Sequence, residues 1–358
     1  MRHRQGRSGG PAERSAPAGR GPTIVDVARR AGVSKGAVSF ALNDRPGVAP
    51  QTRDRILAAA RELGWQPSTR ARALSRSRAY AVGLVMRRAP ELLGADPFFP
   101  QFLAGVETAL AERGSALVLQ VGADDDEAEA SSYRRLARQG RVDGVFLNDM
   151  LVDDHRFGLL TGLGLPAVAV GRPAGPCPFP VVTVDDRQGV ARTVEHLLGL
   201  SHRRVAFVGG TKGYVHSRSR RSAWRQALEA AGGDPGPDLV ADFTGPGGAA
   251  ATRALLGLAD PPTAIVYAND VMAIAGMGVA IGLGLQVPGD LSVTGFDDVP
   301  LAAHLAPPLT TVRQDAQAWG RAAAEVLLAV GEGRPAGDVQ LPPATPVFRA
   351  STGPPHPE

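Results

Sequence analysis

Three apolar segments of the sequence each end in side chains that could hold a small polar molecule. These side chains are Asn148 and Asp149 after VFL, Asn269 and Asp270 after IVYA, and Asp297 and Asp298 after VTGF. A carboxylate accepts hydrogen bonds from hydroxyl groups, and an arginine such as Arg220 in HSRSRRSAW donates them. These polar side chains would suit a polyhydroxylated ligand, with the aromatic ring of Phe243 or Trp224 covering the apolar face of that ligand. Alternatively, Asp270 and Asp298 are helix caps or parts of loop turns.

The sequence shows no spacing that indicates catalysis or a metal site. The histidines of the main body lack a metal-ligand pattern such as HExxH; they are His155, His196, His202, His216 and His304. The stretch IGLGLQVPGD is rich in glycine, but it precedes an expected strand instead of following one, unlike a phosphate-binding turn. Cys177 lies between prolines and is expected to be a free thiol. We therefore expect no enzyme activity, no cofactor and no metal.

The candidate ligand residues require parallel sheets to bring them together. Short apolar strands are expected at AYAVGLVM, ALVLQVG, DGVFLN, PAVAVG, RRVAFVGG, TAIVYAND and LSVTGFDD. Amphipathic helices are expected between them, such as FLAGVETALAERG and the segment from about Ala128 to Gln139. Alternating strands and helices form parallel sheets with helices on both faces, and ligands bind outside the carboxyl ends of the strands.

Length and composition indicate a globular protein of two or three domains. The chain has 358 residues, of which 44% are hydrophobic, and no apolar run of about 18 residues that would predict a membrane span. Residues 1–22 lack the apolar core of a signal peptide and are expected to form a disordered basic tail. A single cysteine cannot form an internal disulfide, which fits the reducing cytoplasm.

Charge is distributed unevenly along the chain. Residues 1–78 hold 16 basic and 5 acidic residues, a balance of +11, and the remainder holds 23 basic and 30 acidic residues, a balance of −7. A basic head on an acidic body is typical of nucleic-acid-binding proteins. The alternative is a solvated basic tail, because five of these arginines precede Gly21.

Residues 23–66 show the pattern of a compact three-helix unit. Thr23 and Ser34 can each cap a helix, and Gly32 between the two helices suits a left-handed turn. A third helix begins near Pro50 and ends before Gly64. The expected inward-facing residues are Ile24, Val27, Ala28, Ala31, Val38, Ala41, Leu42, Ile56, Leu57, Ala60 and Leu63. Two short helices joined by so tight a turn form a helix-turn-helix, whose second helix enters the major groove of DNA.

The second helix of this unit has an unusual outer face. Lys35 is a potential hydrogen-bond donor to guanine, and Phe40 could contact the methyl group of thymine. Gly36 offers no side chain, so it would let the backbone approach closely or leave a base unread.

The segment TIVDVARRAGVSKGAVSFALN, followed by PGVAPQTRDRILAAARELGWQP, closely resembles the headpiece of the LacI/GalR family of transcriptional regulators. The resemblance implies that Lys35, Gly36 and Phe40 occupy the main base-reading positions. It also implies phosphate-anchoring or helix-capping roles for a set of four polar residues. These four are Thr23, Ser34, Ser39 and Asn43. For two of them, Ser39 and Asn43, capping remains an alternative to phosphate contact. Ala49 departs from the family pattern, which usually has a capping serine there.

Residues 67–78, with the sequence PSTRARALSRSR, resemble the family's hinge helix and linker. In the family this helix orders on operator DNA, and paired hinge helices press leucines into the minor groove. The resemblance implies that Leu74 is the wedge with Ala71 beside it, and that Arg70 or Arg72 lies near phosphates. A plain arginine-rich linker is the alternative.

Residues 79–351 resemble the same family's effector-binding and dimerisation domain, which is similar to a type I periplasmic sugar-binding protein. The implied fold is an N-terminal all-α helix-turn-helix headpiece plus an α/β two-lobed, periplasmic-binding-protein-like domain. Its lobe 1 would comprise about residues 79–179 and 309–337, and its lobe 2 about residues 180–308 and 338–351. The implied effector-binding residues are Phe98, Phe99, Asp149, Arg220, Phe243, Asn269 and Asp297.

Together, these features predict a cytoplasmic, sequence-specific regulator of transcription that a small sugar-like effector releases from double-stranded operator DNA. A homodimer is expected, because the final residues GPPHPE contain no leucine heptad for a tetramer, and no membrane partner is expected. The alternatives are an effector that acts as co-repressor, a sugar-binding module without a regulatory role, and a sugar-processing enzyme.

Overall fold

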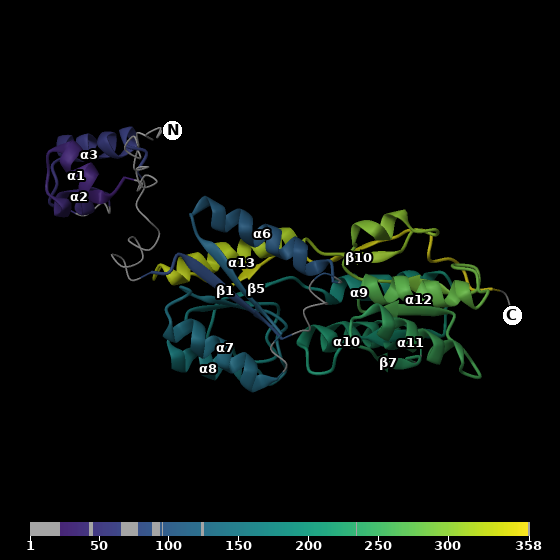
Figure 1. Ribbon diagram of the computed structural model, residues 1–358. Coiled ribbons are helices and arrows are strands. Elements are labelled where there is room, and N and C mark those ends of the chain that lie inside the picture. Colours follow the sequence, from purple (N-terminus) through teal and green to yellow (C-terminus); the bar gives the residue numbers. More distant parts are fainter. Residues whose placement is uncertain are drawn as a thin grey trace, which may run out of the picture. The chain divides into compact units, whose positions relative to one another are not determined.

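The computed structural model describes residues 22–42, 46–65, 78–87, 94, 96–122, 125–233 and 235–356. The chain divides into two compact units, Met1–Ser77 and Arg78–Glu358 (Figure 1). The division follows the change in charge along the sequence, since the first unit carries the basic excess. Each unit has its own hydrophobic core.

The first unit contains helices α1 (Ile24–Ala31), α2 (Lys35–Leu42) and α3 (Pro50–Glu62). Val27, Val38 and Ile56, one from each helix, are fully buried and form the centre of the core. Gly32 ends α1 with φ of 63°, the left-handed conformation that favours glycine. At the start of α3, Ala49 makes no side-chain capping bond, so that cap of the family pattern is absent.

The second unit contains two parallel sheets and a short antiparallel pair. The first sheet has the strand order β11-β5-β4-β3-β1-β2, with β1 (Ala81–Met86), β2 (Ala116–Val121), β3 (Val145–Leu147), β4 (Ala167–Val170), β5 (Val181–Thr183) and β11 (Val339–Gln340). The second has the order β7-β6-β8-β9, with β6 (Val205–Gly209), β7 (Asp238–Val240), β8 (Ala264–Tyr267) and β9 (Ser292–Thr294). Strands β10 (Thr311–Arg313) and β12 (Thr345–Val347) pair antiparallel. The two sheets define two lobes.

Helices cover both faces of the first sheet. Helices α6 (Phe98–Glu112) and α13 (Ala316–Gly331) lie on one face, and α7 (Asp126–Arg138) and α8 (Arg156–Leu163) lie on the other (Figure 1). Alternate residues of β1 therefore enter different cores, because successive strand side chains point to opposite faces: Leu84 packs in the core that contains Phe102 of α6, and Val85 in the core that contains Tyr133 of α7.

In the second lobe, α9 (Arg187–Gly199) packs against α10 (Val215–Ala230), and α11 (Gly245–Leu256) packs against α12 (Asp270–Gly282). A short 3-10 helix, η1 (Pro300–His304), follows β9. Strands β6 and β8 pair at the centre of this sheet.

The chain passes between the lobes a few residues later than the sequence suggested. Strands β5 and β11 pair within the first sheet, although residues from 180 and from 338 were expected in the second lobe. Residues up to Thr183 and Val339–Gln340 pair in the first sheet, and Thr310 and Arg313 bridge to residues 294 and 297 of the second lobe. The passages therefore follow Thr183, Arg313 and Gln340, a few residues after the boundaries expected near residues 179, 308 and 337. These strands are two or three residues long, which is too short for a hydrophobic period to mark them.

Close packing of α6 against α13 depends on two glycines. A Cβ atom on Gly105 would lie 1.9 Å from the carbonyl oxygen of Gln317, and one on Gly320 would lie 2.0 Å from the carbonyl oxygen of Phe102. Both distances are far below van der Waals contact, and the obstacles are backbone atoms that cannot rotate away. The two helices therefore approach as closely as they do only because these positions lack side chains.

We predict that Gly320→Ala lowers the free energy of unfolding by roughly 1–3 kcal/mol, because the helices must separate to admit the methyl group. The matched control is Gly278→Ala in α12, where an added Cβ meets no atom within 4 Å. That change should leave stability equal or raise it by up to about 1 kcal/mol. Urea unfolding of both variants measures the difference, and equal effects would refute the packing account.

Candidate functional site

The outer face of α2 carries the side chains that the sequence singled out. Lys35 and Gly36 are exposed, and Phe40 is 42% exposed although its ring is large and apolar. Ser34 caps the helix, since its hydroxyl accepts a hydrogen bond from the Ala37 N–H at 3.1 Å. Ser39 is half-buried. Phe40 is neither in the buried core of this unit nor among the hydrophobic residues packed against it, so its ring is accessible to a partner.

Two further details concern the edges of this face. Thr23 donates from both its backbone N–H and its hydroxyl to the Asp26 carboxylate, at 2.9 and 2.7 Å, and the hydroxyl bond is the main cause that lowers the pKa of Asp26. Thr23 thus begins α1 as expected. A Cβ on Gly36 would meet only the Ser34 hydroxyl oxygen, at an ordinary 3.7 Å. The fold therefore does not require glycine at position 36. The missing side chain changes only the outer surface of α2.

The remaining expected DNA contacts lie outside the described residues. They are Asn43, Arg70, Ala71, Arg72 and Leu74.

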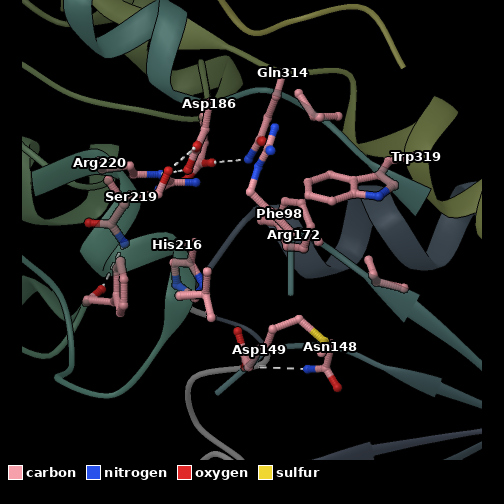
Figure 2. Close-up of a pocket in the computed structure, with 18 of the residues that line it drawn as sticks. Phe98, Asn148, Asp149, Arg172, Asp186, His216, Ser219, Arg220, Gln314 and Trp319 are labelled. Atoms are coloured by element: carbon pink, nitrogen blue, oxygen red, sulfur yellow. Dashed lines mark hydrogen bonds and ion pairs between the residues drawn. The ribbon is translucent and has the colours of Figure 1, made fainter. Parts of the chain in front are cut away.

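The second unit contains a pocket between its two lobes, and all seven of the expected effector-binding side chains line it (Figure 2). They are Phe98, Phe99, Asp149, Arg220, Phe243, Asn269 and Asp297. Asn148 also lines the pocket. These residues come from the carboxyl ends of β3, β7, β8 and β9 and from the starts of α6 and α10, so the rule that ligands lie beyond the carboxyl ends of parallel strands locates the pocket.

Arg220 is the buried cation of the pocket, and it is 7% exposed. Its Nη1 donates to the carbonyl oxygen of Ala268 at 2.6 Å, and its Nε donates to Asp186 Oδ2 at 3.3 Å. The guanidinium carbon lies 3.5 Å from the centre of the Phe296 ring. Arg220 is thus fixed by a carboxylate, a carbonyl and an aromatic face together.

Asp297 provides a buried carboxyl group beside this cation. Its Oδ1 accepts a hydrogen bond from Gln314 Nε2 at 2.8 Å, and its backbone has φ of 111°. Burial raises the pKa of Asp297 well above its usual range; the nearby carboxylates of Asp96 and Asp270 raise it further, and Arg220 opposes them. A carboxyl group that holds its proton can donate to a ligand oxygen as well as accept from a ligand hydroxyl.

Asn269 and Phe243 support one another on the second-lobe side. Asn269 caps α12, since its Oδ1 accepts from the Met272 N–H at 3.0 Å, and its Nδ2 donates to the Phe243 carbonyl at 3.0 Å. Phe243 has φ of 67°, an uncommon conformation for a bulky residue. A Cβ at position 210 would lie 2.0 Å from the Phe243 ring, so Gly210 makes room for that ring.

Aromatic rings from the first lobe form the opposite wall. Phe98 lies edge-on to Trp319 of α13, with ring centres 5.8 Å apart, and also contacts Phe99 at 5.4 Å. Phe99 is only 2% exposed, so Phe98 and Trp319 offer more surface to a ligand. Trp224, the alternative to Phe243, is fully buried against Phe207 and does not line the pocket.

The turn after β3 presents a second polar pair. Asn148 Nδ2 donates to Asp149 Oδ2 at 3.3 Å, and Asp149 has φ of 46°. Within the described residues, the buried Oδ1 of Asn148 has no hydrogen-bond partner in the protein. A ligand hydroxyl would satisfy it.

Asp270 and Asp298 do not line the pocket. Neither is a helix cap, since Asn269 caps α12 and Val299 precedes η1, and both carboxylates instead bind neighbouring loop and strand residues. Asp270 accepts hydrogen bonds from the Val299 N–H at 2.8 Å and the Thr311 hydroxyl at 2.5 Å. Asp298 forms ion pairs with Arg313 and Arg349, at 2.6 and 2.5 Å.

Several lining residues were missed by the sequence interpretation. They are Asp96, Arg172, Asp186, His216, Ser219, Gln314 and Trp319. Asp186 and Gln314 lie in VVTVDDRQG and PPLTTVRQD, close to the lobe boundaries that were expected near residues 180 and 308. A passage must run along the cleft that the lobes enclose, so these two residues could have been found by that reasoning. Ser219 lines the pocket, and its hydroxyl donates to Asp186 at 2.8 Å.

Comparison with protein families assigns both units. Residues 23–68 match the family described as bacterial regulatory proteins, lacI family, and residues 194–352 match the periplasmic binding protein-like domain. The HTH-type transcriptional regulator CelR of Thermobifida fusca is 38% identical over 86% of this chain and 92% of its own. The chain belongs to the LacI family of transcriptional regulators.

Other members and solved structures agree with this assignment. The HTH-type transcriptional repressor CytR of Escherichia coli K12 is 31% identical over 88% of this LacI-family chain and 91% of its own. A structure described as the CelR–cellobiose complex is 33% identical over 92% of this chain and 99% of that chain, with a TM-score of 0.71. The lac repressor dimer bound to operator and the anti-inducer ONPF is 28% identical over 93% of this chain and 100% of that chain, with a TM-score of 0.80.

This LacI-family protein is therefore a DNA-binding transcriptional regulator and not an enzyme. In the described ranges, no group of three or more His, Cys, Asp or Glu side chains is placed to hold a metal ion. Within the same ranges, no helix combines the length and apolar character needed to cross a membrane.

We predict that Lys35→Ala weakens binding of this LacI-family regulator to its preferred operator by roughly 1–3 kcal/mol, as loss of a base contact does. Because Lys35 is exposed on α2, the melting temperature should not change. The operator is first selected from fragments of the source genome, and fluorescence anisotropy then measures affinity for it and for a random duplex. An equal loss on both duplexes would show that Lys35 contacts phosphates only.

Proposed function

We propose that this regulator is a cytoplasmic, homodimeric repressor, and that a small sugar-like effector in the interlobe pocket releases it from operator DNA. The observation that carries the proposal is that the seven side chains implied by the family resemblance line one pocket. They span residues 98–297 and come from both lobes.

The chemistry of the pocket favours a ligand with many hydroxyl groups. Asn148 and Asp149 offer acceptors on one side of the pocket, and Arg220 offers donors on the other (Figure 2). Arg172 is a further donor, and Asp297, beside Arg220, is a further acceptor. Phe98 and Trp319 form an apolar wall suited to the face of a sugar ring. A solved relative is described as a CelR–cellobiose complex, which supports a disaccharide such as cellobiose as the first candidate for the effector.

The release mechanism is a linkage between pocket and headpiece. An effector that binds one arrangement of the lobes more tightly shifts the population toward that arrangement. This changes the interface between the first lobes of the two subunits. The two hinge helices can then no longer form side by side on the operator, and Leu74 of each subunit leaves the minor groove. Operator contacts by Thr23, Ser34, Lys35, Gly36, Ser39, Phe40, Asn43, Arg70, Ala71 and Arg72 belong to the same proposal.

We predict that Arg220→Ala leaves operator affinity within about threefold and abolishes release by sugar, because the pocket loses its fixed donor. The probe is cellobiose, followed by a panel of other disaccharides and monosaccharides, in an operator-release assay by anisotropy. Arg225→Ala is the matched control, since Arg225 lies on the same helix with its side chain 51% exposed. Release of the Arg220→Ala protein at the same sugar concentration as wild type would show that the effector binds elsewhere.

A further inference from the structure

Arg156 is a fully engaged buried charge beside the pocket, not in it. The residue is 2% exposed. Its Nε donates to Asp154 Oδ1 at 2.7 Å and its Nη1 to Glu129 Oε1 at 3.2 Å and the Asn148 carbonyl at 3.0 Å. Its Nη2 donates to the Asp149 carbonyl at 3.2 Å and Asp154 Oδ2 at 2.6 Å. All five N–H groups of the guanidinium therefore have acceptors.

Most of these acceptors belong to one loop, residues 148–154. The Asn148 and Asp149 carbonyls lie at its start, and the Asp154 carboxylate lies at its end. Asp154 also accepts from the Leu151 N–H at 3.1 Å, so the middle of the loop is fixed to the same cluster. Although burial alone would raise the pKa of Asp154, the hydrogen bonds and charge of Arg156 lower it, which keeps this carboxylate ionised.

The same loop forms a backbone contact with the second lobe. The Val152 N–H donates to the Gly213 carbonyl at 3.0 Å, the Val215 N–H donates to the Met150 carbonyl at 2.8 Å, and Leu151 bridges antiparallel to Tyr214. Val215 begins α10, the helix that carries His216, Ser219 and Arg220 into the pocket. The loop thus joins the Asn148–Asp149 pair of the first lobe to the arginine helix of the second.

We propose that Arg156 is a positioning residue for the effector pocket: it fixes the 148–154 loop, and thereby both the Asn148–Asp149 pair and the backbone contact between the lobes. The inference rests on the proposed function of the pocket. Asp149 adopts a left-handed backbone with φ of 46°, and such a conformation persists only where neighbouring contacts hold it. The guanidinium bound to the Asp149 carbonyl supplies that contact.

Two isosteric substitutions test separately the two acidic partners of Arg156, Asp154 in the 148–154 loop and Glu129 on α7. Asp154→Asn replaces one oxygen by an amide nitrogen, although both oxygens accept hydrogen bonds, so at least one N–H group of Arg156 or Leu151 loses its acceptor. Glu129→Gln is the matched control from α7: only Oε1 accepts from Arg156, and Oε2 has no partner in the part of the chain that the structure describes. The amide of a glutamine can therefore keep the same bond.

Hydrogen–deuterium exchange on the full-length protein without sugar tests the anchoring itself. The amides of Val152 and Val215 should exchange about ten- to a hundredfold faster in Asp154→Asn than in wild type, and nearly unchanged in Glu129→Gln. The Ala169 amide in the first sheet is the internal reference. Equal acceleration in both variants, or none in Asp154→Asn, would overturn the proposal.

Sugar titration tests the consequence for the pocket. With the sugar of the panel that binds wild type, Asp154→Asn should raise the dissociation constant by about ten- to a hundredfold and Glu129→Gln by less than about threefold. Faster exchange of the Val152 and Val215 amides with unchanged sugar affinity would overturn the positioning role.

If no sugar binds wild type, the proposed effector class fails, while the exchange result still decides whether Arg156 anchors the loop. Should Asp154→Asn not fold, Arg156→Lys, which keeps the charge but cannot reach all the acceptors, replaces it in both measurements.

Discussion

The pocket depends on how the protein satisfies one buried positive charge, the guanidinium of Arg220. Its partners come from three separate parts of the chain: Asp186 from the first passage between lobes, the Ala268 carbonyl from the end of β8, and the Phe296 ring from the end of β9. Leaving such a charge without its partner destabilises a protein by about 3–5 kcal/mol. The passage and the two strand ends are therefore held together around the guanidinium, and that arrangement creates the site.

Carboxyl groups complete this arrangement. Asp297 is buried near Arg220, and burial raises its pKa well above the usual range. The positive charge of Arg220 opposes this rise at Asp297, because it stabilises the ionised carboxylate. Asp270 lies outside the pocket, and burial raises its pKa to about 7. The pocket therefore combines a fixed cation with a buried carboxyl group, and such a pair can donate to and accept from ligand hydroxyls.

Sequence reasoning could find the pocket because parallel strands align their carboxyl ends. Asn269 and Asp297 each follow a short apolar strand, and such positions are visible without coordinates. The helix-turn-helix was equally visible, since its caps, glycine turn and helical period agree. Asp186 could have been found, because it lies next to an expected passage between lobes, whereas Trp319 lies within α13 and no pattern in the sequence marks it as facing the cleft. The left-handed backbone of Phe243 and the five bonds of Arg156 arise from tertiary contacts, which no local pattern records.

The central claim is that pocket and operator are coupled through the two lobes, and reciprocity gives its most direct test. Calorimetric titration of the binding sugar, with cellobiose as first candidate, would be made into the free protein and into the protein saturated with operator DNA. Coupling of the two sites predicts that bound operator raises the sugar dissociation constant by about 5- to 150-fold. Saturating sugar should raise the operator dissociation constant by the same factor. Equal sugar affinity for both forms, or tighter binding to the operator complex, would contradict it.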